Sequence, residues 1–266
     1  MSDYQHLTIT PGPKHVATVT LDRPDVRNAF NEALIGEITR AMKALSEDDA
    51  IRVIVLAGAG KAFSAGADLT MMQRIAGYSK AENRQEGLHL ADMLAAIFDC
   101  PKPTVALVNG PAIGGGVGLA AACDIVIAAE SAFFALSEVR LGLIPAAISP
   151  YVVRAMGERQ ADRYFLTSER FTASEAKAMG FVHHAVGDDA LGETLEKTVA
   201  SLLKGGPSAQ AQAKSLIRRL QNAPIDRALI EDTAERIAAA RASAEGQEGL
   251  AAFLEKRQPA WTEGLD

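Results

Sequence analysis

Two glycine-rich loops, far apart in the chain, carry the residues with the clearest chemical potential. They are residues 63–68 (FSAGAD) and 109–116 (NGPAIGGG). Glycine leaves a backbone N–H open to a ligand because it has no side chain in the way. Two such loops, each leading to a helix N-terminus, can point two N–H groups at one carbonyl oxygen. The pattern predicts an oxyanion hole that needs no side-chain donor.

A carboxylate follows these loops at Glu138, within residues 136–142 (LSEVRLG). Four apolar residues lie near it in sequence: Leu136, Val139, Leu141 and Leu143. Burial among them would raise the pKa of the Glu138 carboxyl and suit it to proton transfer. From the residues alone, a surface glutamate paired with Arg140 is the alternative.

The elements that must position these residues alternate between strand and helix. Apolar, β-branched runs at 53–57 and 104–108 predict buried strands directly before the two loops. Residues 7–10 and 15–21 predict a hairpin around 11–13, and residues 31–46 predict an amphipathic helix. Ser79 and Thr172 each begin a capping box. Further predicted elements are a helix at 115–123, a strand at 125–129, and C-terminal helices at 208–220, 226–241 and 245–256. The fold class is therefore α/β with a helical C-terminal portion.

Composition places further bounds on function. The chain has 266 residues, 48% of them hydrophobic, and a net charge of −6. This predicts one large domain with a small appendage, and no nucleic-acid surface. Cys100 and Cys123 are expected to be buried free thiols. Residues 1–6 show no export signal and no apolar run is long enough for a membrane span, so we expect a cytoplasmic protein without membrane partners.

Several short segments, in this order and spacing, resemble the crotonase (enoyl-CoA hydratase/isomerase) superfamily along almost the whole chain. They are residues 22–24 (DRP), 27–30 (RNAF), 58–69 (GAGKAFSAGADL), 101–106 (PKPTVA), 109–110 (NG), 114–116 (GGG), 123–125 (CDI), 141–145 (LGLIP) and 253–257 (FLEKR). The resemblance implies a crotonase fold: a ββα spiral core at 1–200 and a helical trimerisation portion at 201–266. It also implies a homo-oligomer, either a trimer or a hexamer.

The resemblance further implies an acyl-CoA substrate and roles for individual residues. The N–H groups of Ala65 and Gly115 would hold the thioester oxygen, and Glu138 would exchange a proton with the substrate. Further substrate-binding positions implied by the loops are Gly66, Ala67, Asp68, Leu69 and Gly114. Arg27 and Lys61 would meet the CoA phosphates, and Phe253 with Lys256 would cover the adenine, although each could instead be structural. We expect Asp68 and Asp124 to brace loops, and the pair His183–His184 to be structural rather than metal-binding. No metal or separate cofactor is expected, because CoA is part of the substrate.

One position departs from the family pattern. Two-glutamate hydratases carry their first glutamate where this chain has Gly118. Either Glu138 alone directs water addition, or a group from elsewhere assists, such as a carboxylate of the substrate itself; the glycine would then make room for a branched acyl group. Residues 137–150 resemble a bacterial subgroup associated with methylglutaconyl-CoA hydration in leucine breakdown. The expected function is enoyl-CoA hydration, with double-bond isomerisation or an inactive acyl-CoA-binding scaffold as alternatives.

Overall fold

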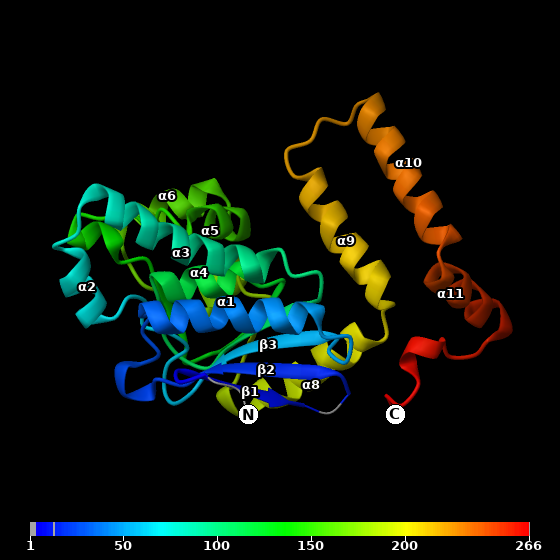
Figure 1. Cartoon of the computed structure of the whole chain (residues 1–266), viewed down its shortest axis with the longest axis horizontal. Helices are drawn as coiled ribbons and strands as arrows, with labels where there is room; N and C mark the ends of the chain where they lie inside the picture. Colours follow the sequence, from blue (N-terminus) through cyan, green and yellow to red (C-terminus); the bar gives the residue numbers. More distant parts are fainter. Residues whose placement is uncertain (1–3, 13, 266) are drawn as a thin grey trace.

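A six-stranded sheet forms the centre of the computed structural model, which describes residues 4–12 and 14–265. Its order is β1 (Leu7–Pro11), β2 (Val16–Leu21), β3 (Val53–Gly58), β4 (Thr104–Val108), β6 (Ile125–Ala129) and β9 (His184–Val186) (Figure 1). β1 and β2 pair antiparallel, as the predicted hairpin requires, and every other neighbouring pair is parallel. Pro13, in the predicted turn, lies outside the described residues, as do Met1, Ser2 and Asp3, where no export signal is expected.

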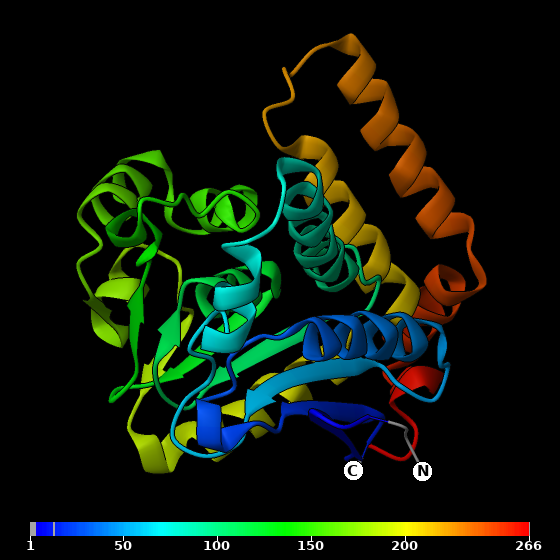
Figure 2. The ribbon, with the colours of Figure 1, turned by 60° about the vertical axis from the view of Figure 1, so that its left-hand side comes forward.

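Helices cover both faces of this sheet because its central strands are apolar on both faces. Ile54 and Leu56 of β3 pack in the core that contains α1 (Glu32–Glu47), α3 (Lys80–Phe98) and α4 (Gly115–Ala122). Val53 and Val55 face the other way, into a smaller cluster with α8 (Leu191–Leu203). Figure 2 shows α1 and α8 on opposite sides of the sheet. The alternation follows from the two-residue period of a strand, so both loops emerge from a sheet held on two sides.

A second, three-stranded sheet was not predicted from the sequence. It joins β5 (Ala112–Ile113), β7 (Phe133–Ala135) and β8 (Phe171–Thr172). These strands are too short for a periodic pattern, but they share a buried aromatic cluster in which Phe134 stacks on Phe171 at 5.3 Å between ring centroids. The connecting helices are α2 (Leu69–Ile75), α5 (Ser149–Met156), α6 (Glu158–Thr167) and α7 (Ala173–Ala178), with 3-10 turns η1 (Pro24–Val26), η2 (Glu138–Leu141) and η3 (Asp188–Ala190).

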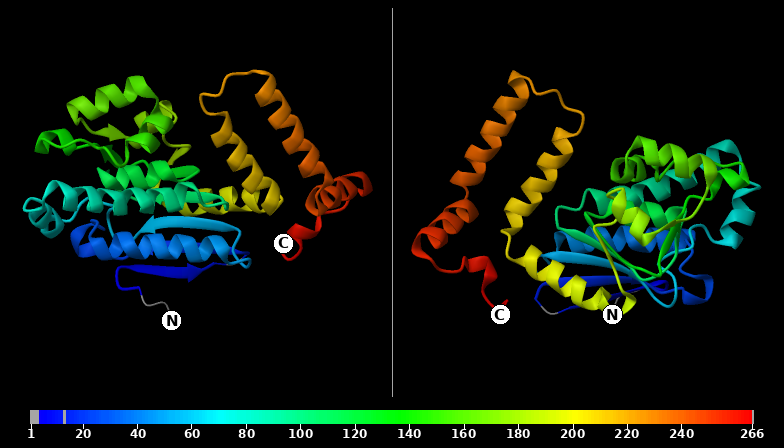
Figure 3. Two further views of the ribbon diagram at one scale, coloured as in Figure 1. Left: turned by 45° about the horizontal axis from the view of Figure 1, so that its top comes forward. Right: turned by 180° about the vertical axis from the view of Figure 1, so that it is seen from behind.

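The C-terminal helices project from the core. α9 (Pro207–Leu220), α10 (Arg227–Ala242) and α11 (Ala244–Glu255) extend to one side of the sheet layers, followed by η4 (Ala260–Thr262) (Figure 3). This part of the chain carries several exposed apolar side chains: Ile217, Leu220, Ile225, Ile230, Ile237, Leu250, Phe253 and Leu254. The division of the chain at residue 200 stays a prediction.

Local signals read from the sequence are confirmed at several element ends. Both capping boxes form, with Ser79 capping α3 and Thr172 capping α7. Asp124 accepts hydrogen bonds from the N–H and hydroxyl of Thr104, and His183 accepts one from the Val126 N–H, so both have the structural roles expected of them.

The cysteines are buried free thiols, as expected: Cys100 and Cys123 form no disulfide. Within residues 4–12 and 14–265, no three His, Cys, Asp or Glu side chains are grouped so that they could hold a metal. No helix of this part of the chain has the length and apolarity that a bilayer crossing requires.

Candidate active site

The two glycine loops meet through their backbones. Ser64 and Ala112 form an isolated parallel bridge, in which the Ile113 N–H donates to the Ser64 oxygen at 2.9 Å. A methyl group on Gly116 would lie 2.5 Å from the Ser64 oxygen, and one on Gly66 would lie 2.7 Å from the Ile113 oxygen. Only glycine fits at these two crossings, because any Cβ would overlap the backbone of the other loop. The loops are therefore in direct contact, as their proposed common role requires.

Ala65 is not free to serve as an oxyanion donor. Its N–H donates to the backbone oxygen of Arg27 at 2.9 Å, so the sequence-based choice of Ala65 is wrong. The reason is the conformation of Gly66, whose φ of +83° turns the chain at the next residue. Such a turn cannot be located from the letters of the segment alone.

Ala67 has the open N–H instead. Residues 66–68 bridge to Phe30: the Phe30 N–H donates to the Gly66 oxygen and the Asp68 N–H donates to the Phe30 oxygen. Successive N–H groups of an extended segment point to opposite sides, so the Ala67 N–H points away from Phe30. No hydrogen bond in the described part of the chain uses the N–H of Ala67 or of Gly115. These two donors belong to loops that touch each other.

Gly115 begins α4, so its N–H lies at the positive end of the helix dipole. Gly114 precedes it with φ +53°, a left-handed conformation that favours glycine. A methyl group on Gly66 would lie 3.6 Å from the Gly115 nitrogen, which places the turn before Ala67 beside this second donor. Negative charge that develops on an oxygen held here would be stabilised by both N–H groups and by the helix dipole.

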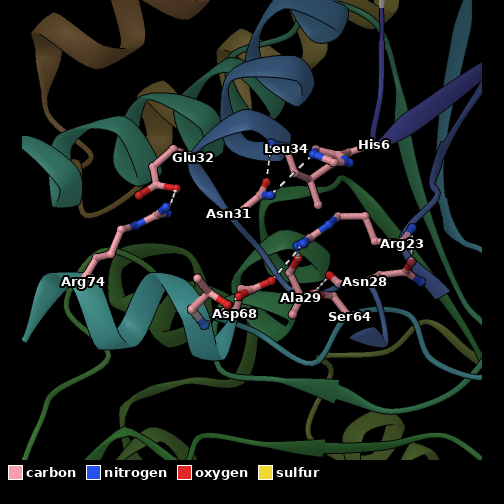
Figure 4. A network of polar contacts seen from close by, with 11 residues as sticks. His6, Arg23, Asn28, Ala29, Asn31, Glu32, Leu34, Ser64, Asp68 and Arg74 are labelled. Carbon is pink, nitrogen blue, oxygen red and sulfur yellow. Dashed lines mark hydrogen bonds and ion pairs between the residues drawn. The ribbon is translucent and has the colours of Figure 1, made fainter. Parts of the chain in front are cut away.

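A polar network behind the first loop fixes its shape (Figure 4). Asn28 is fully buried and donates to the oxygens of Ala59 and Ala62, while its own backbone oxygen accepts from the Ser64 hydroxyl at 2.9 Å. Arg23 forms a 2.8 Å ion pair with Asp68, and both side chains are largely buried. The loop is thus held by hydrogen bonds at several points and presents its donors without rearrangement.

Asp68 braces the loop rather than binding substrate. Its carboxylate accepts from the Thr70 N–H at the start of α2 and from Arg23. Burial alone would raise the pKa of Asp68, but these hydrogen bonds outweigh it and hold the pKa below its ordinary value. Both carboxylate oxygens accept hydrogen bonds inside the protein and Asp68 does not line the cavity, which favours the bracing role expected of it.

Glu138 faces the loops from the start of η2. A methyl group on Gly114 would lie 3.0 Å from Glu138 Oε1, so the carboxylate sits directly against the second loop. Oε2 is buried and has no hydrogen-bond partner within the described residues, and no ion pair there joins Glu138 to Arg140. Burial raises the pKa of Glu138, although a hydrogen bond from its own backbone N–H opposes this. A carboxyl with one unpartnered oxygen and a raised pKa suits proton transfer.

One cavity of about 330 Å³ brings the donors and the carboxylate together. Of the residues expected at the site, those lining it are Ala65, Gly66, Ala67, Gly114, Gly115 and Glu138. Those that do not line it are Arg27, Lys61, Asp68, Leu69, Gly118, Phe253 and Lys256. Leu69 is 78% exposed, and Phe253 is 80% exposed on the projecting α11. Most of the remaining lining is apolar, from α2, α3 and residues 141–148, so the cavity can exclude water from an acyl chain.

Gly118 makes room for a side chain of the protein and not for substrate. A methyl group at position 118 would lie 2.2 Å from Ile148 Cγ2 and 2.6 Å from Ile148 Cβ. Ile148 is 2% exposed and lines the cavity in its place. The expectation that the glycine leaves space for a branched acyl group is therefore wrong. The residue that fills this space is thirty positions later in the chain, and no local pattern connects the two.

Glu86 is a second carboxylate in the cavity, and sequence reasoning missed it. It lies on α3, four residues before Leu90, at the start of the apolar row that continues through Leu94 and Ile97. Extending that row by one turn towards the N-terminus would have found a glutamate where an apolar residue is expected. Burial raises the pKa of Glu86, and the nearby charge of Glu32 raises it further.

Comparisons with known proteins establish the family and the fold. The family model described as enoyl-CoA hydratase/isomerase matches residues 12–264. An enoyl-CoA hydratase of Alternaria alternata is 39% identical over 206 residues, which cover 77% of this chain and 67% of that protein. The crystal structure of an enoyl-CoA hydratase from Shewanella pealeana superposes with a TM-score of 0.94 at 43% identity, with 97% of each chain covered.

A second solved structure, Pseudomonas aeruginosa AtuE, superposes with a TM-score of 0.93 at 38% identity, covering 97% of this chain and all of that one (100%). Agreement of this kind along nearly the full length of both chains confirms the crotonase fold that the sequence segments predicted. The chain belongs to the enoyl-CoA hydratase/isomerase family.

Proposed function

We propose that the protein adds water across the 2,3 double bond of an enoyl-CoA thioester. The thioester oxygen would accept hydrogen bonds from the N–H groups of Ala67 and Gly115. As charge moves from the double bond to this oxygen, the two donors and the α4 dipole stabilise it. The observation that supports this most directly is that two unused backbone N–H groups share one cavity with a glutamate whose buried Oε2 has no hydrogen-bond partner in the described residues.

Glu138 would carry both proton transfers. Its carboxylate takes a proton from water as the water oxygen bonds to C3, and the same carboxyl returns a proton to C2. Both new bonds then form on one face of the substrate. Because Ile148 occupies the space beside Gly118, the first glutamate of the two-glutamate hydratases has no counterpart at that position.

Double-bond isomerisation is the second candidate, and the Gly118–Ile148 contact favours it. One carboxyl suffices to remove a proton from C2 of a 3-enoyl-CoA and to deliver a proton to C4. An inactive acyl-CoA-binding scaffold is the third candidate. The unused N–H groups of Ala67 and Gly115 and the raised pKa of Glu138 argue against it.

The rest of the assignment extends from the sequence resemblance. The enzyme would need no cofactor, since CoA is part of the substrate. Methylglutaconyl-CoA is the substrate that the resemblance alone predicts, and Arg27 and Lys61, both exposed, stay predicted contacts of the CoA phosphates. Phe253 on α11 and Lys256 directly after it do not line the cavity, so their predicted adenine contact would be made in an assembly. The exposed apolar side chains of α9–α11 support a trimer or hexamer.

A panel of CoA thioesters tests the function. The wild-type enzyme should consume the conjugated double bond of crotonyl-CoA or 3-methylglutaconyl-CoA and yield the 3-hydroxyacyl product. Conversion of a 3-enoyl-CoA to a 2-enoyl-CoA without any hydration would establish the isomerase instead. Binding without turnover of any member of the panel would leave only the scaffold.

A further inference from the structure

We propose that Glu86 selects the acyl group of the substrate, by accepting a hydrogen bond from a donor on the acyl chain such as a hydroxyl or an amine. The inference deepens the proposed function, since it assumes that an acyl chain fills the cavity. It identifies a residue that contacts the acyl chain and the chemical class of the group that this residue would bind, a hydrogen-bond donor.

The position of Glu86 on α3 is where an apolar residue belongs. Glu86, Leu90, Met93, Leu94 and Ile97 recur at the spacing of one helix face, and Met93, Leu94 and Ile97 are fully buried in the core. The first member of this row instead places a carboxylate in the cavity. A polar residue that breaks a buried apolar pattern requires a compensating partner or a functional reason.

No partner for Glu86 is present in the described part of the chain. It takes part in none of the hydrogen bonds or ion pairs found there, although it is only partly exposed. Arg74 pairs with Glu32 and not with Glu86 (Figure 4). Glu32 adds like charge near Glu86, and His89 on the same helix is the one group that opposes it. The carboxylate is therefore left for something that enters the cavity.

Apart from Glu86, the cavity lining that α2 and α3 contribute is apolar. Met71, Met72 and Ile75 of α2 line the cavity, as do Gly87 and Leu90 of α3. A purely apolar acyl chain that fills this space would remove water from the carboxylate without replacing its hydrogen bonds, which is unfavourable. A hydroxyl or an amine would replace them. A carboxylate on the acyl chain would face a like charge and would be disfavoured.

The role proposed for Glu86 and the methylglutaconyl substrate predict opposite effects of Glu86 on substrate binding. If the substrate carries a carboxylate, Glu86 should hinder its binding; if it carries a donor, Glu86 should favour it. The preference of the wild-type enzyme, together with its change on substitution, separates the two.

The test measures kcat/KM for matched 2-enoyl-CoAs: pentenoyl and hexenoyl chains, the same chains with a terminal hydroxyl, and 3-methylglutaconyl-CoA. Wild-type enzyme should prefer a hydroxylated chain to its apolar match by about 10- to 100-fold, the range of one hydrogen bond to a charged group. Glu86→Leu should reverse that preference. Glu86→Gln should retain part of it and should raise kcat/KM for 3-methylglutaconyl-CoA.

Asp92→Asn is the matched control, because Asp92 is an exposed carboxylate on the same helix that does not line the cavity. It should leave every preference unchanged. A hydroxyl preference that is absent in the wild type, or that survives Glu86→Leu, would overturn the inference while leaving the proposed function intact. A preference for 3-methylglutaconyl-CoA that Glu86→Gln does not increase would overturn it as well. Failure of wild-type enzyme to hydrate any member would instead refute the proposed function.

Discussion

Placing a methyl group at position 118 should destabilise the protein, and the structure gives the reason and the scale. Gly118 lies within α4, where exchange of glycine for alanine would ordinarily stabilise by about 1 kcal/mol. Here the new Cβ would lie 2.2 Å from Ile148 Cγ2 and 2.6 Å from Ile148 Cβ. Carbon atoms in favourable contact are about 3.5–4.0 Å apart, so both side chain and backbone of Ile148 must move.

Overpacking of this kind typically costs about 1–3 kcal/mol, occasionally more. Set against the helix preference of alanine, which is about 1 kcal/mol, this cost means that Gly118→Ala should lower the free energy of unfolding by about 0–2 kcal/mol. Ile148→Gly removes both clashing atoms and leaves only the Ile148 Cα, at 3.6 Å from the new Cβ. In that background Gly118→Ala should become stabilising.

A double-mutant cycle tests this explanation. The free energy of unfolding in urea is measured for the wild type, both single variants and the double variant at one fixed protein concentration. Ile148→Ala serves as an intermediate case, because it removes Cγ2 but keeps Cβ. If Gly118→Ala is as stabilising in the wild-type background as in the Ile148→Gly background, the packing explanation is refuted. The same reasoning predicts that Gly118→Glu alone cannot create a two-glutamate site.

Three further predictions concern the catalytic carboxylate, the loop brace and the assembly. Glu138→Gln should lower kcat by about 10²–10⁴-fold while a saturated acyl-CoA binds as before; a near-normal kcat would contradict its role. Because burial raises the pKa of Glu138, the folded chain holds that proton more tightly than the unfolded chain. The free energy of unfolding should therefore fall as pH rises from the ordinary glutamate pKa through the raised one, and Glu138→Gln should abolish this fall. Asp68→Asn should cost about 1.5–3 kcal/mol of stability and weaken thioester binding, since Arg23 loses its charged partner. The pKa of Asp68 is lowered in the folded chain. The stability that Asp68 contributes is therefore present above its unfolded pKa and is lost as the pH falls through its folded pKa. Sedimentation equilibrium should show a trimer or hexamer, and a stable monomer at micromolar concentration would refute the proposed assembly.

The sequence predicted the fold well because its signals are local. The strands at 104–108 and 125–129 and both capping boxes need only neighbouring residues, and all of them are present. The site was predicted less well, because its details depend on contacts between distant segments. Whether Ala65 or Ala67 has the open N–H depends on a bond to Arg27, and the role of Gly118 depends on Ile148. Family resemblance transferred the residue types but not these contacts.

Glu86 shows a different kind of failure. Apolar residues recur along one face of α3 from Leu90 onward, and no sequence motif marks the glutamate one turn earlier as part of a site. Its place in the cavity becomes visible only when α2 and α3 are seen to line the same space.

The two proposed donors at Ala67 and Gly115 are backbone N–H groups, and this affects how the protein can vary. No exchange of one side chain for another deletes a backbone N–H, proline excepted, so a saturation scan should find position 67 tolerant. Intolerance should concentrate at Gly66 and Gly116, where any Cβ meets the opposite loop. Side chains on the cavity wall, such as Glu86, are free of that constraint. Mutations of side chains that line the cavity can therefore change which acyl group is accepted. The two backbone N–H groups that polarise the thioester are unchanged by such mutations.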